Sequence, residues 1–174
     1  VRPAVSSPLA SQDNTIIGNT VLYGATAGRL FAAGQAGERF AVRNSGATVV
    51  VEGCGANGCE YMTGGIAVVL GEVGANFGAG MTGGMAFVYD PKGTFARRAN
   101  PESIVWQRLA ALHWESVLQN LIREHAEVTD SKWSRGILED WEREAGHFWQ
   151  VVPKEMLTRL AHPLDDSEVL EAAE

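Results

Sequence analysis

A GxGxxG pattern covers residues 53–58 and follows three valines, with Glu52 between them. In nucleotide-binding βαβ units, such glycines let the backbone approach a pyrophosphate, and a helix beginning within the motif directs its amides at the phosphates. Here the motif leads into another glycine-rich stretch with β-forming residues and no helical pattern. The glycines are therefore interpreted as corners of a repeat, and dinucleotide binding stays open as the alternative.

Two further groups of residues could carry chemistry. Cys54 and Cys59 are the only cysteines, whereas a structural zinc or iron–sulfur site needs three or four soft ligands. We interpret both as small buried thiols. Glu144 and His147 form one half of the ExxH arrangement of di-iron carboxylate sites, and the second half is missing. We expect Glu144 to face solvent and His147 to pack near Phe148.

The overall composition excludes several classes of function. The chain has 174 residues, 45% of them hydrophobic, and a formal net charge of −7. Such an acidic chain is not expected to bind nucleic acid or an anionic membrane. No apolar run reaches the roughly 20 residues needed to span a bilayer, so we expect a cytoplasmic protein. The chain begins with Val1 rather than Met, which suggests a piece of a longer protein.

Composition changes sharply near residue 90. Residues 1–90 hold 17 of the 20 glycines, whereas all five tryptophans lie in residues 91–174. This shift predicts a glycine-rich domain over residues 1–90 and an α-helical extension over residues 91–174, packed on the first domain or on a neighbour.

An internal repeat organises the glycine-rich part. Residues 47–65 read ATVVVEGCGANGCEYMTGG and residues 66–84 read IAVVLGEVGANFGAGMTGG, an offset of 19. Repeats of this length, each with short β-forming runs between glycines, cannot bury an apolar face alone and stack into a solenoid. The sequence therefore predicts a parallel β-helix. Its structural repeat residues are Gly55, Asn57, Met62, Gly64, Gly65, Gly74, Asn76, Met81, Gly83 and Gly84.

Equivalent residues of successive coils are expected to form ladders. Val50 would stack on Val69, Met62 on Met81, and Asn57 on Asn76. The glycines would supply corners that need a positive φ or a close approach of two backbones. Gly64 in particular is assigned to a positive-φ corner.

The second half of the chain has helical periodicity. Asn100 can cap a first helix, with Pro101 in its first turn, that runs to about His125. Two apolar stripes lie along it. The first contains Val105, Leu109 and Leu112, and the second contains Leu118, Leu121 and His125.

Two more helices are predicted after residue 128. The second would begin at Thr129 or Asp130, and its apolar side would carry Trp133, Ile137, Trp141, Ala145 and Phe148. The third would begin at Pro153 and end at Pro163. The acidic tail, residues 165–174, is expected to fray.

Several long strings are typical of one protein family. They are NTIIGNTVLYGAT (residues 14–26), AGERFAVRNSGA (36–47) and GCEYMTGG (58–65), with shorter matches at residues 51–53, 76–81 and 151–155. Together they closely resemble the C-terminal domain of the glutamate synthase large (alpha) subunit. Cys54 and the Ala56–Asn57 pair depart from the residues that this family often has there.

The resemblance implies a right-handed parallel β-helix over residues ~14–90, followed by packing helices. It also implies an enzyme that makes two glutamates from glutamine and 2-oxoglutarate, with FMN and an iron–sulfur cluster held by other domains. This chain would contain no catalytic, cofactor-binding or metal residue. It would brace the amidotransferase and FMN domains, which would be its partners. The small subunit and further copies of the chain are additional candidate partners.

Two other functions stay open. One is an independent β-helix protein that binds a nucleotide or an acyl carrier, which the GxGxxG pattern and the histidines motivate. The other is a β-helix subunit of a different oxidoreductase, such as the formylmethanofuran dehydrogenase type, against which the helical extension argues. If the family's coils continue upstream of Val1, the first coil here would expose unpaired backbone groups.

Overall fold

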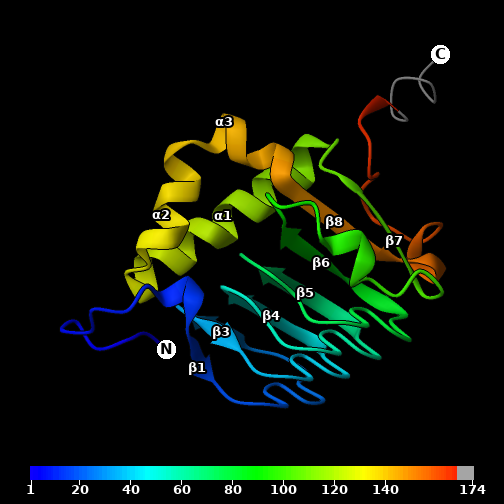
Figure 1. Ribbon diagram of the computed structural model, residues 1–174. Helices are drawn as coiled ribbons and strands as arrows, with labels where there is room; N and C mark the ends of the chain where they lie inside the picture. Colours follow the sequence, from blue (N-terminus) through cyan, green and yellow to red (C-terminus); the bar gives the residue numbers. More distant parts are fainter. Residues whose placement is uncertain (168–174) are drawn as a thin grey trace.

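The structure, a computed structural model, describes residues 1–167. Its main sheet starts with four parallel strands that pair in chain order: β2 (Arg29–Ala32), β4 (Ser45–Val51), β5 (Thr63–Val69) and β6 (Gly83–Tyr89). β1 (Thr15–Ile17) and β3 (Gln35–Ala36) form a separate parallel pair. Each strand is one side of a coil, and the coils stack on one another (Figure 1). The predicted solenoid of stacked β-coils is confirmed.

Both faces of the main sheet are buried. Val49 and Val51 contact the core inside the coils. Val50, between them, belongs to a second core together with Val68 and Phe87, which lies under the helices. Parallel strands covered on both faces have continuous apolar sequences instead of an alternating pattern. The run of three valines in β4 follows from this two-sided burial.

Three helices cover the outer face of the sheet: α1 (Leu112–Thr129), α2 (Lys132–Glu139) and α3 (Trp141–Glu144). Leu118, Leu121 and His125 are buried on one side of α1, as their spacing predicted. Leu118 and Leu121 pack into the same core as Val50. The helices are therefore fastened to the solenoid by an apolar layer.

The first helix begins later than predicted. Ile104–Arg108 forms strand β7, and α1 begins at Leu112, so Asn100 does not cap it. The side chain of Asp166 accepts a hydrogen bond from the backbone N–H of Leu112 at 2.9 Å. The predicted stripe of Val105, Leu109 and Leu112 is wrong, because Val105 lies in a strand and Leu112 is 72% exposed.

The second and third predicted helices are largely wrong. The second helix is broken at Asp140, and Phe148–Pro153 forms strand β8, which lies antiparallel between β6 and β7. An unpaired β6 would leave an open sheet edge, and β8 covers it. Within the described residues of the predicted third helix, 153–163, only the 3-10 helix Lys154–Met156 is formed. Most of the predicted tail, residues 168–174, lies outside the described residues.

The register of the coils corrects one predicted ladder. Val50 pairs with Val68 rather than with Val69. The register shifts between Ser45 and Thr48, where β4 has one more residue than the matching part of β5. From Thr48 onward, β4 and β5 therefore pair with an offset one residue shorter than the sequence repeat, whereas β5 and β6 pair at the full offset from Ile66 onward.

Candidate functional site

The predicted asparagine ladder is present at one corner of the coils. The side-chain amide of Asn76 donates to Asn57 Oδ1 at 3.0 Å. The amide of Asn100 in turn donates to Asn76 Oδ1 at 2.8 Å. Asn57 and Asn76 have φ values of 61° and 62°. Asparagine tolerates this left-handed conformation. Asn100, read from the sequence as a helix cap, is the third rung of the ladder.

The methionine and glycine positions of the repeat lie where coils come closest. Met62 and Met81 are 0% and 1% exposed inside the solenoid. A Cβ added to Gly64 would lie 2.3 Å from the carbonyl oxygen of Ser45 in the previous coil, and Gly64 has no positive φ. The positive-φ assignment of Gly64 is wrong, and the adjacent Gly65, with φ +83°, adopts that conformation. The same close approach to a backbone atom occurs at Gly55, Gly74, Gly83 and Gly84.

Sequence reasoning missed a series of left-handed residues that are not glycine. In one coil Arg39, Ala41 and Arg43, which are two residues apart, all have a positive φ. The same two-residue spacing recurs in the neighbouring coils, at Thr20 and Leu22 and at Asn57, Cys59 and Tyr61. In the coils of Arg39 and Asn57, their N–H groups donate alternately to the next and the previous coil, as Tyr61 does to Ala79 and Cys59 to Phe40, both at 2.8 Å. These bonds offset the cost of the left-handed backbone. Only the asparagines carried a sequence signal for it.

The backbone amides of the GxGxxG motif are used within the solenoid. The N–H groups of Cys54 and Asn57 donate to carbonyls of the next coil, and that of Gly55 donates to the previous coil. No helix begins in residues 53–58. A pyrophosphate would have to compete with these bonds, so the geometry favours the interpretation as a repeat corner.

Both cysteines are buried, as predicted. Burial raises the pKa of the Cys54 thiol from 9.0 to about 12, and it raises the pKa of Cys59 well above the usual value. A thiol is a nucleophile or a metal ligand only as the thiolate. At neutral pH these residues therefore act as apolar packing groups.

The prediction that Glu144 faces solvent is wrong, because its side chain is buried. It is 8% exposed and accepts hydrogen bonds from the Tyr89 hydroxyl at 2.5 Å and from Arg143. Burial by itself would raise the pKa of Glu144, but these hydrogen bonds and the Arg143 charge outweigh it and lower the pKa. The ring of His147 packs edge-on against Tyr89. Within residues 1–167, no group of three His, Cys, Asp or Glu side chains could hold a metal ion.

A buried polar cluster, also missed by sequence reasoning, joins the solenoid to the helices. Glu52, directly after β4, and His125, on α1, both have fully buried side chains, and Glu52 Oε1 lies 3.2 Å from His125 Nε2. The Ser131 hydroxyl donates to the same carboxylate oxygen and also accepts from the N–H of Ser134, capping α2. Glu52 follows three apolar residues and His125 lies on an apolar helix face, which were the available signals.

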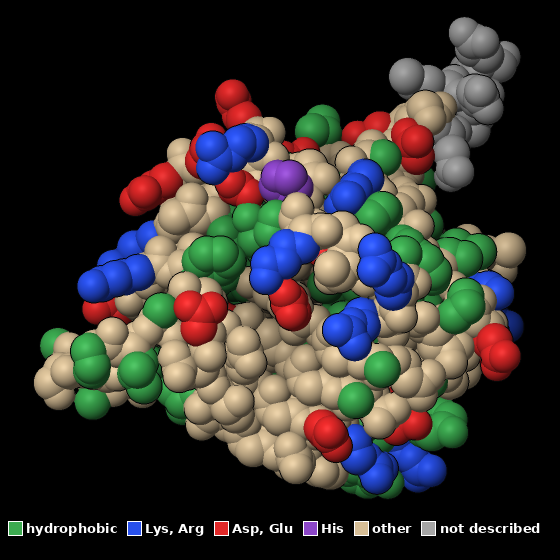
Figure 2. All heavy atoms as spheres, viewed as in Figure 1, with side chains coloured by type: hydrophobic (Ala, Val, Ile, Leu, Met, Phe, Trp, Pro, Cys, Tyr) green, Lys and Arg blue, Asp and Glu red, His purple; other side chains and the backbone are tan. Residues whose placement is uncertain are grey.

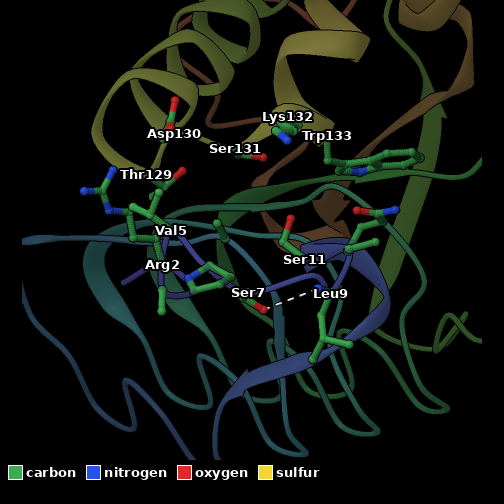
Figure 3. A pocket seen from close by; sticks show the side chains of 15 residues that line it. Arg2, Val5, Ser7, Leu9, Ser11, Thr129, Asp130, Ser131, Lys132 and Trp133 are labelled. Atoms are coloured by element: carbon green, nitrogen blue, oxygen red, sulfur yellow. Dashed lines mark hydrogen bonds between the residues drawn. The ribbon is translucent and has the colours of Figure 1, made fainter.

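A hollow of about 450 Å³ lies between the N-terminal residues and the connection of α1 with α2 (Figure 3). Ser7, Ser11 and Ser131 line it together with the cationic Arg2 and Lys132. Ser7 Oγ already accepts the backbone N–H of Leu9 at 3.3 Å. The hollow contains none of the residues that the sequence marked for chemistry.

Charged side chains are unevenly distributed over the face of the molecule shown in Figure 2. On the face shown in Figure 2, charged side chains gather over the helices and around the rim of the coils, and a broad area over the coils carries few of them. A weakly charged surface can dock on another protein without desolvating many ions. Among the described residues, no helix has the length and apolar content needed to cross a bilayer.

Comparison with known proteins identifies the family. The family model described as the GXGXG motif matches residues 1–154. This chain belongs to the GXGXG motif family. The GXGXG domain is 66% identical over 164 residues to the glutamate synthase [NADPH] large chain of Azospirillum brasilense. The matched region covers 94% of this chain and 11% of that protein.

Two ferredoxin-dependent relatives match the GXGXG domain over a similar region. Ferredoxin-dependent glutamate synthase 2 of Synechocystis sp. is 53% identical over 87% of this chain and 10% of its own length. The chloroplastic ferredoxin-dependent glutamate synthase of Spinacia oleracea is 50% identical over 88% of this chain and 9% of its own length. The resemblance to the glutamate synthase large subunit is confirmed, and the chain spans about a tenth of the length of these relatives.

Proposed function

We propose that this GXGXG domain is the non-catalytic structural part of a glutamate synthase and braces its amidotransferase and FMN domains. The carrying observation is the 66% identity to the large chain of one such enzyme over 94% of this sequence. In this proposal the parent enzyme, in the cytoplasm, converts glutamine, 2-oxoglutarate and a reductant into two glutamates. FMN and the iron–sulfur cluster are bound by its other domains.

The geometry of the coils supports a bracing role. Hydrogen bonds run from coil to coil along the solenoid, and the sheet is packed on both faces. Close packing on both sides makes a protein layer resist deformation. A rigid spacer of this kind holds two attached domains at one separation, which an ammonia channel between them requires.

The proposal is tested in a complete glutamate synthase that contains this domain. Deleting residues 66–84 removes one coil and shortens the spacer, and Glu72→Ala serves as a control that leaves the coil intact. We expect the deletion to keep bound FMN and glutamine hydrolysis but to release ammonia to solvent instead of coupling it to glutamate formation. Unchanged coupling would contradict the bracing role. Binding of FMN or hydrolysis of glutamine by the 174-residue chain alone would contradict its non-catalytic assignment.

A further inference from the structure

The last described residues form a strap across the start of α1. In this C-terminal strap, residues 162–167, the Pro163 carbonyl accepts from Trp114 Nε1 at 2.9 Å. The Asp166 side chain accepts from the N–H of Leu112 at 2.9 Å, and the N–H of Asp166 donates to Ala110 at 3.3 Å. Leu164 packs against the core beneath the helices.

A pair of stacked histidines forms a further contact between the strap and α1. The rings of His113, on α1, and His162, on the strap, have centroids 3.6 Å apart and planes only 19° from parallel. Both residues are exposed. The indole of Trp114 lies edge-on to both rings, with centroids at 4.8 Å and 6.0 Å. The stack is thus a contact between two segments far apart in the sequence.

Histidine is the side chain whose charge ordinarily changes between pH 5 and 8. A stack with one proton keeps its contact, whereas two positive rings at this spacing repel each other. We propose that the His113–His162 stack is an acid-sensitive clasp that holds the strap at neutral pH and releases it when both rings are protonated. Release uncovers Trp114 and the apolar residues under Leu164.

Several charged groups on the strap, on α1 and on β7 make contacts with residues other than the two histidines. On the strap, Asp165 accepts from Ser167 and Asp166 from Leu112. On α1, the Glu115 carboxylate accepts from Trp141. At the end of β7, the Arg108 guanidinium lies 3.5 Å from the ring centroid of Trp149. Lys154, Glu155 and Arg159 precede the strap, and all three are exposed.

Amide hydrogen exchange of the 174-residue chain at pH 7.5 and 5.5 tests the clasp, with rates corrected for intrinsic exchange. We expect the protection of the Asp166 and Leu112 amides to fall roughly fivefold or more at pH 5.5, the size expected for repulsion between two adjacent charges in water. The amides of β4–β6 should keep their protection. His162→Phe retains a stacked ring without a titrating nitrogen, so its strap protection should change less than twofold.

Three results would overturn the clasp. One is that the Asp166 and Leu112 amides of the wild type are equally protected from exchange at both pH values, which includes the case in which they are unprotected at both. Another is the same loss in His162→Phe as in the wild type. The third is a parallel loss in β4–β6, which would indicate acid unfolding of the whole chain.

Discussion

At the scale of single residues, the spacing between coils leaves no room for a side chain at Gly64. We expect Gly64→Ala to lower the free energy of unfolding by about 3 kcal/mol, because its Cβ would meet the Ser45 carbonyl oxygen at 2.3 Å and one coil would have to shift. Gly18→Ala is the matched control, since no atom lies within 4 Å of its Cβ position. Urea denaturation measures both, and equal midpoints would contradict the close approach.

The buried contact of Glu52 with His125 and Ser131 sets a second residue-scale expectation. Glu52→Ala removes the common acceptor of both partners, and each buried hydrogen-bonding group left without a partner costs about 1–3 kcal/mol. Glu124→Ala removes a carboxylate that pairs with Arg29 at the surface and should cost less than about 1 kcal/mol. Similar unfolding free energies for the two variants, measured in urea, would show that the buried cluster contributes little.

At the scale of elements, the sheet depends on a strand supplied by the second half of the chain. Gln150 lies in β8 between two strands, and its partner Gln107 lies in β7 at the sheet edge. Proline removes a ladder hydrogen bond and is tolerated only at edges. We expect Gln150→Pro to prevent cooperative folding and Gln107→Pro to leave a folded, less stable protein, as seen by circular dichroism and thermal melting. The opposite order would contradict the position of β8.

At the scale of the whole molecule, the buried thiols predict a loss of stability in alkali. The unfolded Cys54 thiol ionises near pH 9.0, whereas in the folded protein burial raises its pKa to about 12. Above pH 9 the unfolded chain therefore releases a proton that the folded chain keeps, so stability falls as pH rises. At pH 10.5 the loss from Cys54 is about 2 kcal/mol, at 1.36 kcal/mol per pKa unit.

The double variant Cys54→Ala/Cys59→Ala isolates this effect. Alanine cannot ionise, so the loss of packing in the core lowers stability by the same amount at every pH. We expect the variant to lose less stability than the wild type between pH 8 and 10.5 in urea titrations. Tyr89 leaves some slope in both proteins, because burial and its hydrogen bond to Glu144 raise its pKa. Identical slopes would mean that the thiols do not resist ionisation.

Much of the solenoid could be predicted from the sequence, because its determinants repeat. The 19-residue offset aligns Asn57 with Asn76 and Met62 with Met81, and each pair performs the same task in successive coils. The left-handed conformation of Ala41 and Tyr61 could not be predicted, since neither residue type favours it. It is imposed by hydrogen bonds to the coils on either side.

By itself the sequence determined the stacked coils, the buried thiols and the apolar face of α1, because each follows from a local period or composition. Only the tertiary structure decided that Ile104–Arg108 and Phe148–Pro153 are strands, and that Glu52 meets His125. Short apolar stretches of this kind fit either a helix or a strand. β6 precedes β8 by more than fifty residues in the chain. Pairing with β8 satisfies the free backbone groups at the open edge of β6, and Phe148–Pro153 therefore forms a strand.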